Sequence, residues 1–225
     1  MLELDLDDLD QMQVAGEMMR AGMRTDGKTL SASLSAAQAA RLTRKSEELG
    51  LPIALLDGFE PWLASLMLTS VSLIKQGYSA ESGVDQQLAS RARADRKSVT
   101  GLETPAQQFA AFDRLNASAQ LHLLTMTLDE LDKGGAELSA IEQAWRSGNT
   151  EKMARALGDE MADFPELEAA LLTNRNRMWL PAIRAMQSGS DDVLVVVGAA
   201  HLLGDSGIIA LLRASGQKPL PFPKP

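Results

Sequence analysis

The sequence predicts an α/β or α+β protein, helix-rich overall, in which a small mixed β-sheet carries a large and mostly helical insertion. Three segments have the pattern of β-strands, and each of them leads into a helix. We therefore expect one domain over residues 1–225. Its sheet portion would comprise residues 1–7, 97–104 and 190–225, and its helical portions residues 8–96 and 105–189.

The first strand-like segment alternates Leu2, Leu4 and Leu6 with acidic residues, which is the period of two typical of a strand. Only helix follows it for many residues, so we expect that partner strands precede it in the natural chain. An unpaired strand edge invites association. The segment Leu2–Leu6 thus favours a homodimer.

The next part of the chain has the apolar spacing of helices. Ser35 is placed to cap the second of them, and Gly50 to end it. Pro61 occupies the first turn of the third helix, where proline is favoured. The predicted helices are Asp8–Met23, Ala36–Leu49, Pro61–Gln76 and Ser82–Asp95.

The second strand-like segment is Ser98–Glu103, and it leads into Thr104 and Pro105, which open a helix. From there the pattern is almost entirely helical, and glycine-containing pairs divide it into short antiparallel pieces. The predicted helices here are Ala106–Leu115, Ser118–Leu131, Ala136–Trp145, Thr150–Leu157 and Phe164–Met186.

The third strand-like segment is the apolar, largely β-branched run Val193–Val197, which is typical of a strand buried on both faces. It runs directly into Gly198-Ala-Ala-His201. Asp205 or Ser206 is expected to cap a last helix over Gly207–Ala214.

Composition excludes several classes of function. With 45% hydrophobic and 23% charged residues the chain is an ordinary globular protein, not a disordered one. A net charge of -8 repels phosphate backbones and anionic lipid, so no nucleic-acid partner is expected. The absence of cysteine excludes disulfides, thiolate catalysis, iron–sulfur clusters and cysteine-ligated zinc.

No apolar stretch is long enough to span a bilayer, and the first residues lack the basic and apolar regions of a signal peptide. We therefore expect a soluble chain with no membrane span.

His201 is the strongest candidate for chemistry. Ligands of open α/β sheets bind just beyond the carboxyl ends of strands, where this histidine is expected, and Gly198 allows close approach of the backbone. The alternative is a histidine that merely closes the strand end and bonds to the main chain. His122 lies within a predicted helix and is better explained as a surface or partly buried helix residue.

Two glutamates are candidates as well. Glu103 ends the second predicted strand, and if that strand neighbours the third, Glu103 and His201 face one crevice. Such a ligand mixture suits a hard or borderline divalent metal. The alternative for Glu103 is a favourable charge at the N-terminus of the next helix. The alternative for Glu3 is a solvated strand residue.

A third group lies in the predicted helix 164–186, where two asparagines alternate with two arginines ahead of Trp179. Such a pattern usually forms a solvated face. Functionally, Arg175 could clamp a carboxylate or stabilise an oxyanion. The chain has no Gly-x-Ser-x-Gly elbow, P-loop or dinucleotide-binding fingerprint.

Several segments, in this order and spacing, together resemble the TraB/GumN family, whose eukaryotic relatives include the Tiki proteases. They extend from one end of the chain to the other. These segments are Leu2-Glu3-Leu4-Asp5, Pro61-Trp62, Gly83-Val84-Asp85, Gly101-Leu102-Glu103-Thr104 with Gln107 and Gln108, Ala144-Trp145-Arg146-Ser147-Gly148, Arg175-Asn176 with Trp179, and Val197-Gly198-Ala199-Ala200-His201-Leu202.

The resemblance implies a metal-dependent, peptidase-like hydrolase that uses Mn, Co or Zn and acts on a peptide or a small molecule. Gly198 and His201 match the second of the family's two Gly-x-x-His motifs, and the two glutamates match its acidic positions. His201 and Glu103 would hold the metal. Glu3, Glu103 and Arg175 would be catalytic, and Gly198 and Asn176 would bind substrate.

The family's first Gly-x-x-His motif lies upstream of the position of Glu3, and this sequence has no counterpart. We therefore expect a shortened chain that lacks full activity. Many bacterial members carry a signal peptide, which implies a periplasmic or secreted setting for the natural protein.

Two alternatives are open. One is a non-catalytic ligand- or peptide-binding protein of the cell envelope or of polysaccharide export. The other is a haem-binding protein like those of the ChaN type, with His201 as an iron ligand.

Overall fold

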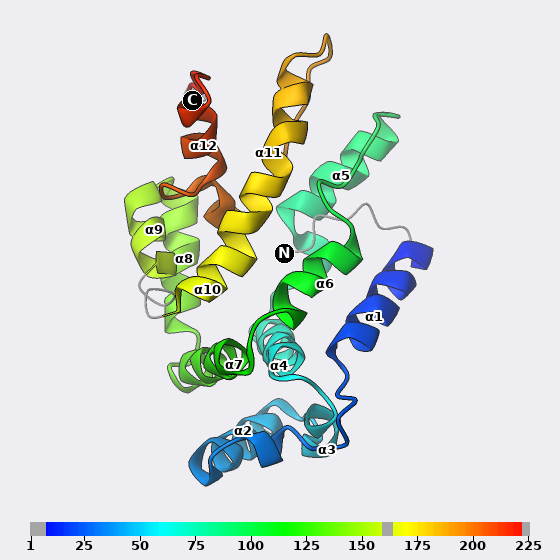
Figure 1. Ribbon diagram of the computed structural model, residues 1–225, viewed down its shortest axis with the longest axis vertical. Helices are drawn as coiled ribbons and strands as arrows, with labels where there is room; N and C mark the ends of the chain where they lie inside the picture. Colours follow the sequence, from blue (N-terminus) through cyan, green and yellow to red (C-terminus); the bar gives the residue numbers. More distant parts are fainter. Residues whose placement is uncertain (1–7, 159–163, 222–225) are drawn as a thin grey trace. The chain divides into compact units, whose positions relative to one another are not determined.

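The computed structural model describes residues 8–158 and 164–221 (Figure 1). These residues form helices joined by loops. The helices are α1 (Asp8–Gly22), η1 (Ser31–Ser33), α2 (Ala36–Leu49), α3 (Ile53–Asp57), α4 (Pro61–Lys75), η2 (Ala80–Ser82), α5 (Val84–Ala94), α6 (Pro105–Asp113), α7 (Ala117–Asp132), α8 (Ala136–Ser147), α9 (Thr150–Gly158), α10 (Pro165–Glu168), η3 (Ala169–Thr173), α11 (Asn174–Gln187), η4 (Ala199–Leu202) and α12 (Ile208–Ala214).

The predicted α/β or α+β class with a mixed sheet is wrong for the described part of the chain, which contains no β-strand. The segments Ser98–Glu103 and Val193–Val197 are irregular, and an isolated β-bridge joins Met23 to Phe59. A strand is stable only when its backbone groups pair with a neighbouring strand, so β-branched composition alone does not make one. The predicted strand Leu2–Leu6 lies outside the described residues.

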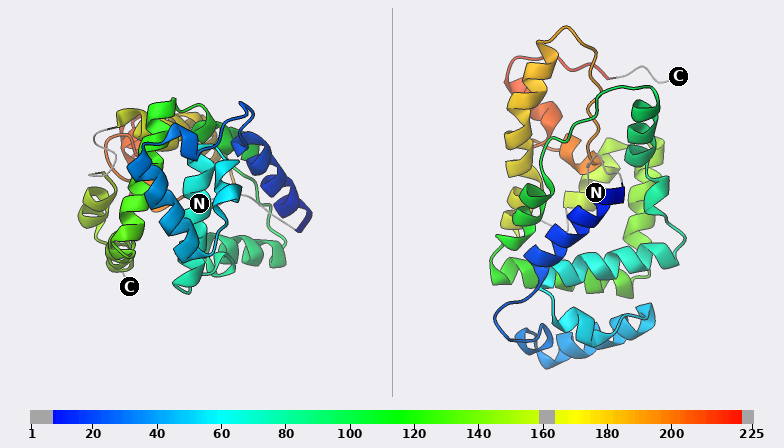
Figure 2. Two further views of the ribbon diagram at one scale, coloured as in Figure 1. Left: turned by 90° about the horizontal axis from the view of Figure 1, so that it is seen from below. Right: turned by 90° about the vertical axis from the view of Figure 1, so that its right-hand side faces the viewer.

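The described residues divide into two compact units, with the boundary between Ser139 and Ala140, inside α8. In the N-terminal unit α4 lies along α7, as Figure 2 shows, and α2 packs on both. The centre of its core is Trp62, which is fully buried and stacks on Phe109 and Phe112 at ring-centroid distances of 6.2 and 5.5 Å.

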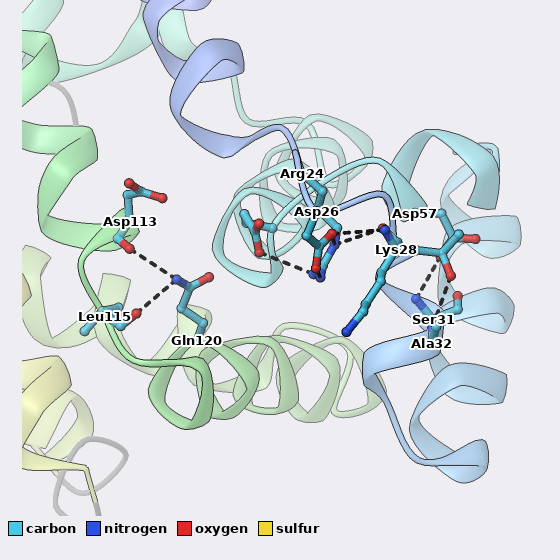
Figure 3. Close-up of polar contacts among 11 residues, drawn as sticks. Arg24, Asp26, Lys28, Ser31, Ala32, Asp57, Asp113, Leu115 and Gln120 are labelled. Atoms are coloured by element: carbon cyan, nitrogen blue, oxygen red, sulfur yellow. Dashed lines mark hydrogen bonds and ion pairs between the residues drawn. The ribbon is translucent and has the colours of Figure 1, made fainter.

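Polar side chains close the loops of this unit (Figure 3). Arg24 donates to the Lys28 carbonyl and forms ion pairs with Asp26 and Glu60. The Asp57 carboxylate accepts from the backbone N–H of Ser31. These contacts hold the two ends of the segment between α1 and α4 close to each other.

Most of the helix starts and ends predicted from local sequence signals are confirmed. Ser35 caps α2 in a reciprocal capping box with Gln38, and Gly50 ends it in the left-handed conformation at φ 76°. Thr104 and Gln107 form the same box at the start of α6. The cap predicted for the last helix is wrong, because Gly207 occupies that position without a side-chain bond.

In the C-terminal unit α12 packs on α11 (Figure 1), and the apolar side chains of Trp179, Leu167 and Leu212 are buried. The predicted helix 164–186 is present as three consecutive segments: α10, the π-helix η3 and α11. No helix within the described ranges is both long and apolar enough to cross a bilayer.

Candidate functional site

The C-terminal unit brings four of the six predicted site residues into two neighbouring segments. Arg175 and Asn176 lie in the first turn of α11. Gly198 precedes the 3-10 helix η4, which contains His201. Glu103 belongs to the N-terminal unit, and Glu3 lies outside the described residues.

The side chains of His201 and Asn176 are in direct contact. Nδ1 of the imidazole lies 2.6 Å from Oδ1 of Asn176. The amide nitrogen of Asn176 donates to the carbonyl oxygens of Ser206, over 2.9 Å, and His201, over 3.4 Å. Asn176 is 1% exposed and His201 is 7% exposed, so both side chains belong to the interior of this unit.

The imidazole also packs against an aromatic ring. The ring centroids of Trp179 and His201 are 4.6 Å apart, with the planes inclined at 48°. The Arg175 guanidinium stands 4.8 Å from the Trp179 ring centroid and donates to the Leu171 carbonyl over 3.0 Å. The start of α11 thus supplies an amide and an indole that contact the histidine, and a cation that packs on the indole.

This environment keeps the imidazole neutral. Burial lowers the pKa of His201 from 6.5 to about 4, and the positive charge of Arg175 adds to this effect. At pH 7 the side chain therefore carries a single proton. A neutral imidazole is the form that binds metal ions or accepts a proton.

Gly198 leaves space at the same point. A Cβ atom at this position would meet Cδ2 of His201 at 3.7 Å, an ordinary van der Waals contact. The backbone of Gly198, at φ -55° and ψ 137°, is accessible to any residue. Neither the conformation nor the packing of this chain therefore requires glycine here, and a role in ligand approach stays a prediction.

The sequence does not predict a second contact, which joins the loop before α12 to α10. The Ser206 hydroxyl donates to the Glu168 carboxylate over 3.1 Å, across 38 positions. Ser206 thus fixes the loop before α12 through its side chain to α10 and through its carbonyl to α11. Ser206, one of the two residues expected to cap α12, instead holds the segment after His201 against α10 and α11.

Other candidates lie apart from this cluster in the sequence. Glu103 is half-buried just before the capping box of α6. His122 lies on α7 and is partly buried, as predicted. Among the described residues there is no group of three or more His, Asp or Glu side chains that could hold a metal ion.

A cavity of about 380 Å³ lies elsewhere on the C-terminal unit. It is lined by residues of α11, among them Pro181 and Arg184, and by Ser188 and Gln217. His201 and Asn176 do not line it. We place the candidate site at His201 because the polar contacts and the perturbed pKa are found there.

Comparisons with known proteins agree with the resemblance seen in the sequence. The family model described as the TraB/PrgY/gumN family matches residues 1–219. Two relatives, from Escherichia coli K12 and Shigella flexneri, are both called uncharacterized protein YbaP. Each is 28% identical over 186 residues, which cover 83% of this chain and 69% of the relative. No solved structure matches the chain.

Proposed function

Because the chain belongs to the TraB/PrgY/gumN family, we propose that it is a metal-dependent, peptidase-like hydrolase whose centre is built around His201. The observation that carries this proposal is the contact between His201 and Asn176, at 2.6 Å. With Nδ1 occupied, the nitrogen left for chemistry is Nε2. A buried imidazole held in this way is suited to bind an ion or to take a proton.

The residues around His201 fit a divalent metal in part. Histidine ligands of metals usually direct their second ring nitrogen to an oxygen acceptor, and Asn176 supplies one here. Mn, Co or Zn accept imidazole and carboxylate together. Glu103 and Glu3 are the carboxylates that we propose for the rest of the set. The chemistry that a bound ion would supply is polarisation of the scissile carbonyl and activation of water.

The remaining roles belong to charged side chains. One glutamate, Glu103 or Glu3, would take the proton of the attacking water. Arg175 would stabilise the negative charge that develops on the carbonyl oxygen. Its guanidinium is already oriented by the Trp179 ring and the Leu171 carbonyl, so little conformational freedom would be lost on binding. Gly198 would let the substrate backbone approach the imidazole.

The test is metal retention together with peptide hydrolysis. The purified protein is incubated with Mn, Co or Zn, dialysed, and analysed by mass spectrometry for bound metal. His201→Ala is compared with His122→Ala, which removes the chain's other histidine. We expect about one ion per chain that His201→Ala loses and His122→Ala keeps, with cleavage of a peptide library following the same pattern.

If the protein retains none of the three metals and cleaves no peptide, the proposal is rejected. Ligand binding that survives His201→Ala and needs no metal would instead favour a non-catalytic binding protein.

A further inference from the structure

The hydrogen bonds of Asn176 fix which way its amide faces. The nitrogen Nδ2 lies 2.9 Å from the carbonyl oxygen of Ser206 and 3.4 Å from that of His201. Carbonyl oxygens can only accept hydrogen bonds, so the NH₂ group must be on that side. The amide oxygen Oδ1 therefore faces the imidazole.

The direction of the amide determines the proton on the imidazole. An amide oxygen cannot donate, and Oδ1 of Asn176 lies 2.6 Å from Nδ1 of His201. Nδ1 must therefore carry the hydrogen. A neutral imidazole has one N–H, so its lone pair is on Nε2. Two backbone carbonyls thus set the tautomer of the histidine through a single asparagine.

We propose that Asn176 is a positioning residue, which holds the proton of His201 on Nδ1 and presents the lone pair of Nε2 to the reacting centre. The contact of Nε2 with a metal or a substrate rests on the proposed function, whereas the assignment of the tautomer does not. Asn176 is 1% exposed and both ends of its amide are engaged within the protein, so we assign it to His201 rather than to substrate.

A purely structural role for Asn176 makes a different prediction. In that case the amide would only fasten the loop 201–206 to α11 through its nitrogen. Asn176→Asp removes this donor but keeps an oxygen acceptor toward Nδ1, whereas Asn176→Ala removes both. The two variants therefore separate positioning from fastening. Asn174→Ala, an exposed change on the same turn of α11, is the matched control.

The first measurement is the ¹⁵N NMR spectrum of the His201 ring in metal-free protein at pH 8. We expect a protonated Nδ1 and an unprotonated Nε2 in the wild type, in Asn174→Ala and in Asn176→Asp. In Asn176→Ala the proton is expected to populate Nε2. A wild-type spectrum with the proton on Nε2 would overturn the inference without any variant. Equal loss of the Nδ1–H form in Asn176→Asp and Asn176→Ala would also overturn it.

The second measurement is Zn²⁺ affinity, which tests the link to the proposed function. Asn176→Ala is expected to weaken binding by about 10–100-fold, as removal of a partner of a metal-bound histidine does. Asn176→Asp is expected to stay close to the wild type. If the wild type binds no Zn²⁺ but shows the Nδ1–H form, the metal site is rejected and the tautomer assignment stands.

Discussion

Arg41 on α2 and Asp132 at the end of α7 form an ion pair, with Nε 2.7 Å from the carboxylate oxygen. Nζ of Lys45 lies 2.9 Å from the other oxygen of the same carboxylate. Hydrogen bonds from Lys45 and Arg41 lower the pKa of Asp132 from 3.8 to about 2. Nη2 of Arg44 lies 3.3 Å from the same carboxylate, so Asp132 joins three cations of α2 to α7.

Asp132→Asn is expected to destabilise the N-terminal unit at pH 7. The loss would be about 1 kcal/mol, because the pairs are partly exposed to water and screened by it. The folded pKa lies below the unfolded one, so this stabilisation is complete above about pH 4 and lost as the pH falls through 2. Urea denaturation at pH 7 and pH 2 measures both effects. Asp95→Asn, which removes a longer exposed pair with Arg91, is the control.

Protonation of His201 should also make the free energy of unfolding depend on pH. Its pKa falls from 6.5 to about 4 on folding, so the unfolded chain binds more protons between these values. In EDTA, the free energy of unfolding should fall by roughly 3 kcal/mol as the pH drops from 6.5 to 4. His201→Gln should flatten this part of the curve. An unchanged slope in the variant would mean that another group is responsible.

Gly22→Ala and Gly16→Ala should have opposite effects, although both glycines lie on α1. A Cβ at Gly22 would be 2.6 Å from Cδ2 of Leu63, so the change should cost about 1–3 kcal/mol. A Cβ at Gly16 would meet nothing within 4 Å, and alanine should stabilise the helix by about 0.5–1 kcal/mol. Denaturation of both variants checks the pair. Equal effects would contradict the packing at Gly22.

Trp62→Ala should unfold or severely weaken the N-terminal unit. The side chain is fully buried and stacks on two phenylalanines of α6, and its removal is expected to cost roughly 3–5 kcal/mol. Trp145 is 51% exposed, so Trp145→Ala should change stability by less than about 0.5 kcal/mol. Thermal unfolding followed by circular dichroism compares the two. A large effect of Trp145→Ala would show that this indole is covered in solution.

The helices were predictable because their signals are local. Ser35 and Gln38 specify the start of α2 within four residues, and Gly50 specifies its end. Whether a β-sheet forms was not predictable, because a strand depends on a partner strand that no local pattern identifies. The run Val193–Val197 has strand composition, yet in the structure Leu194 is 74% exposed and the segment is irregular.

The sequence predicts four residues that lie on α11 and around η4 in the C-terminal unit, but not the contacts between them. Motif resemblance identified Asn176 and His201, which are 25 positions apart. Spacing alone could not show that one side chain holds the other, because the contact depends on how the loop before α12 returns to α11. For the same reason Asn176 was assigned to substrate, a role that its burial does not favour.

The π-helix η3 immediately precedes the turn that carries Arg175, Asn176 and Trp179. A π-helical turn contains one residue more than an α-helical turn, and each residue of an α-helix adds a rotation of about 100° about the helix axis. Deleting one residue from Ala169–Thr173 would therefore swing all three side chains together to a different face relative to α10. The number of residues in this segment therefore determines the direction in which the three side chains project. Relatives that keep the asparagine–histidine contact should tolerate insertions and deletions in the loop 188–198 and reject them here.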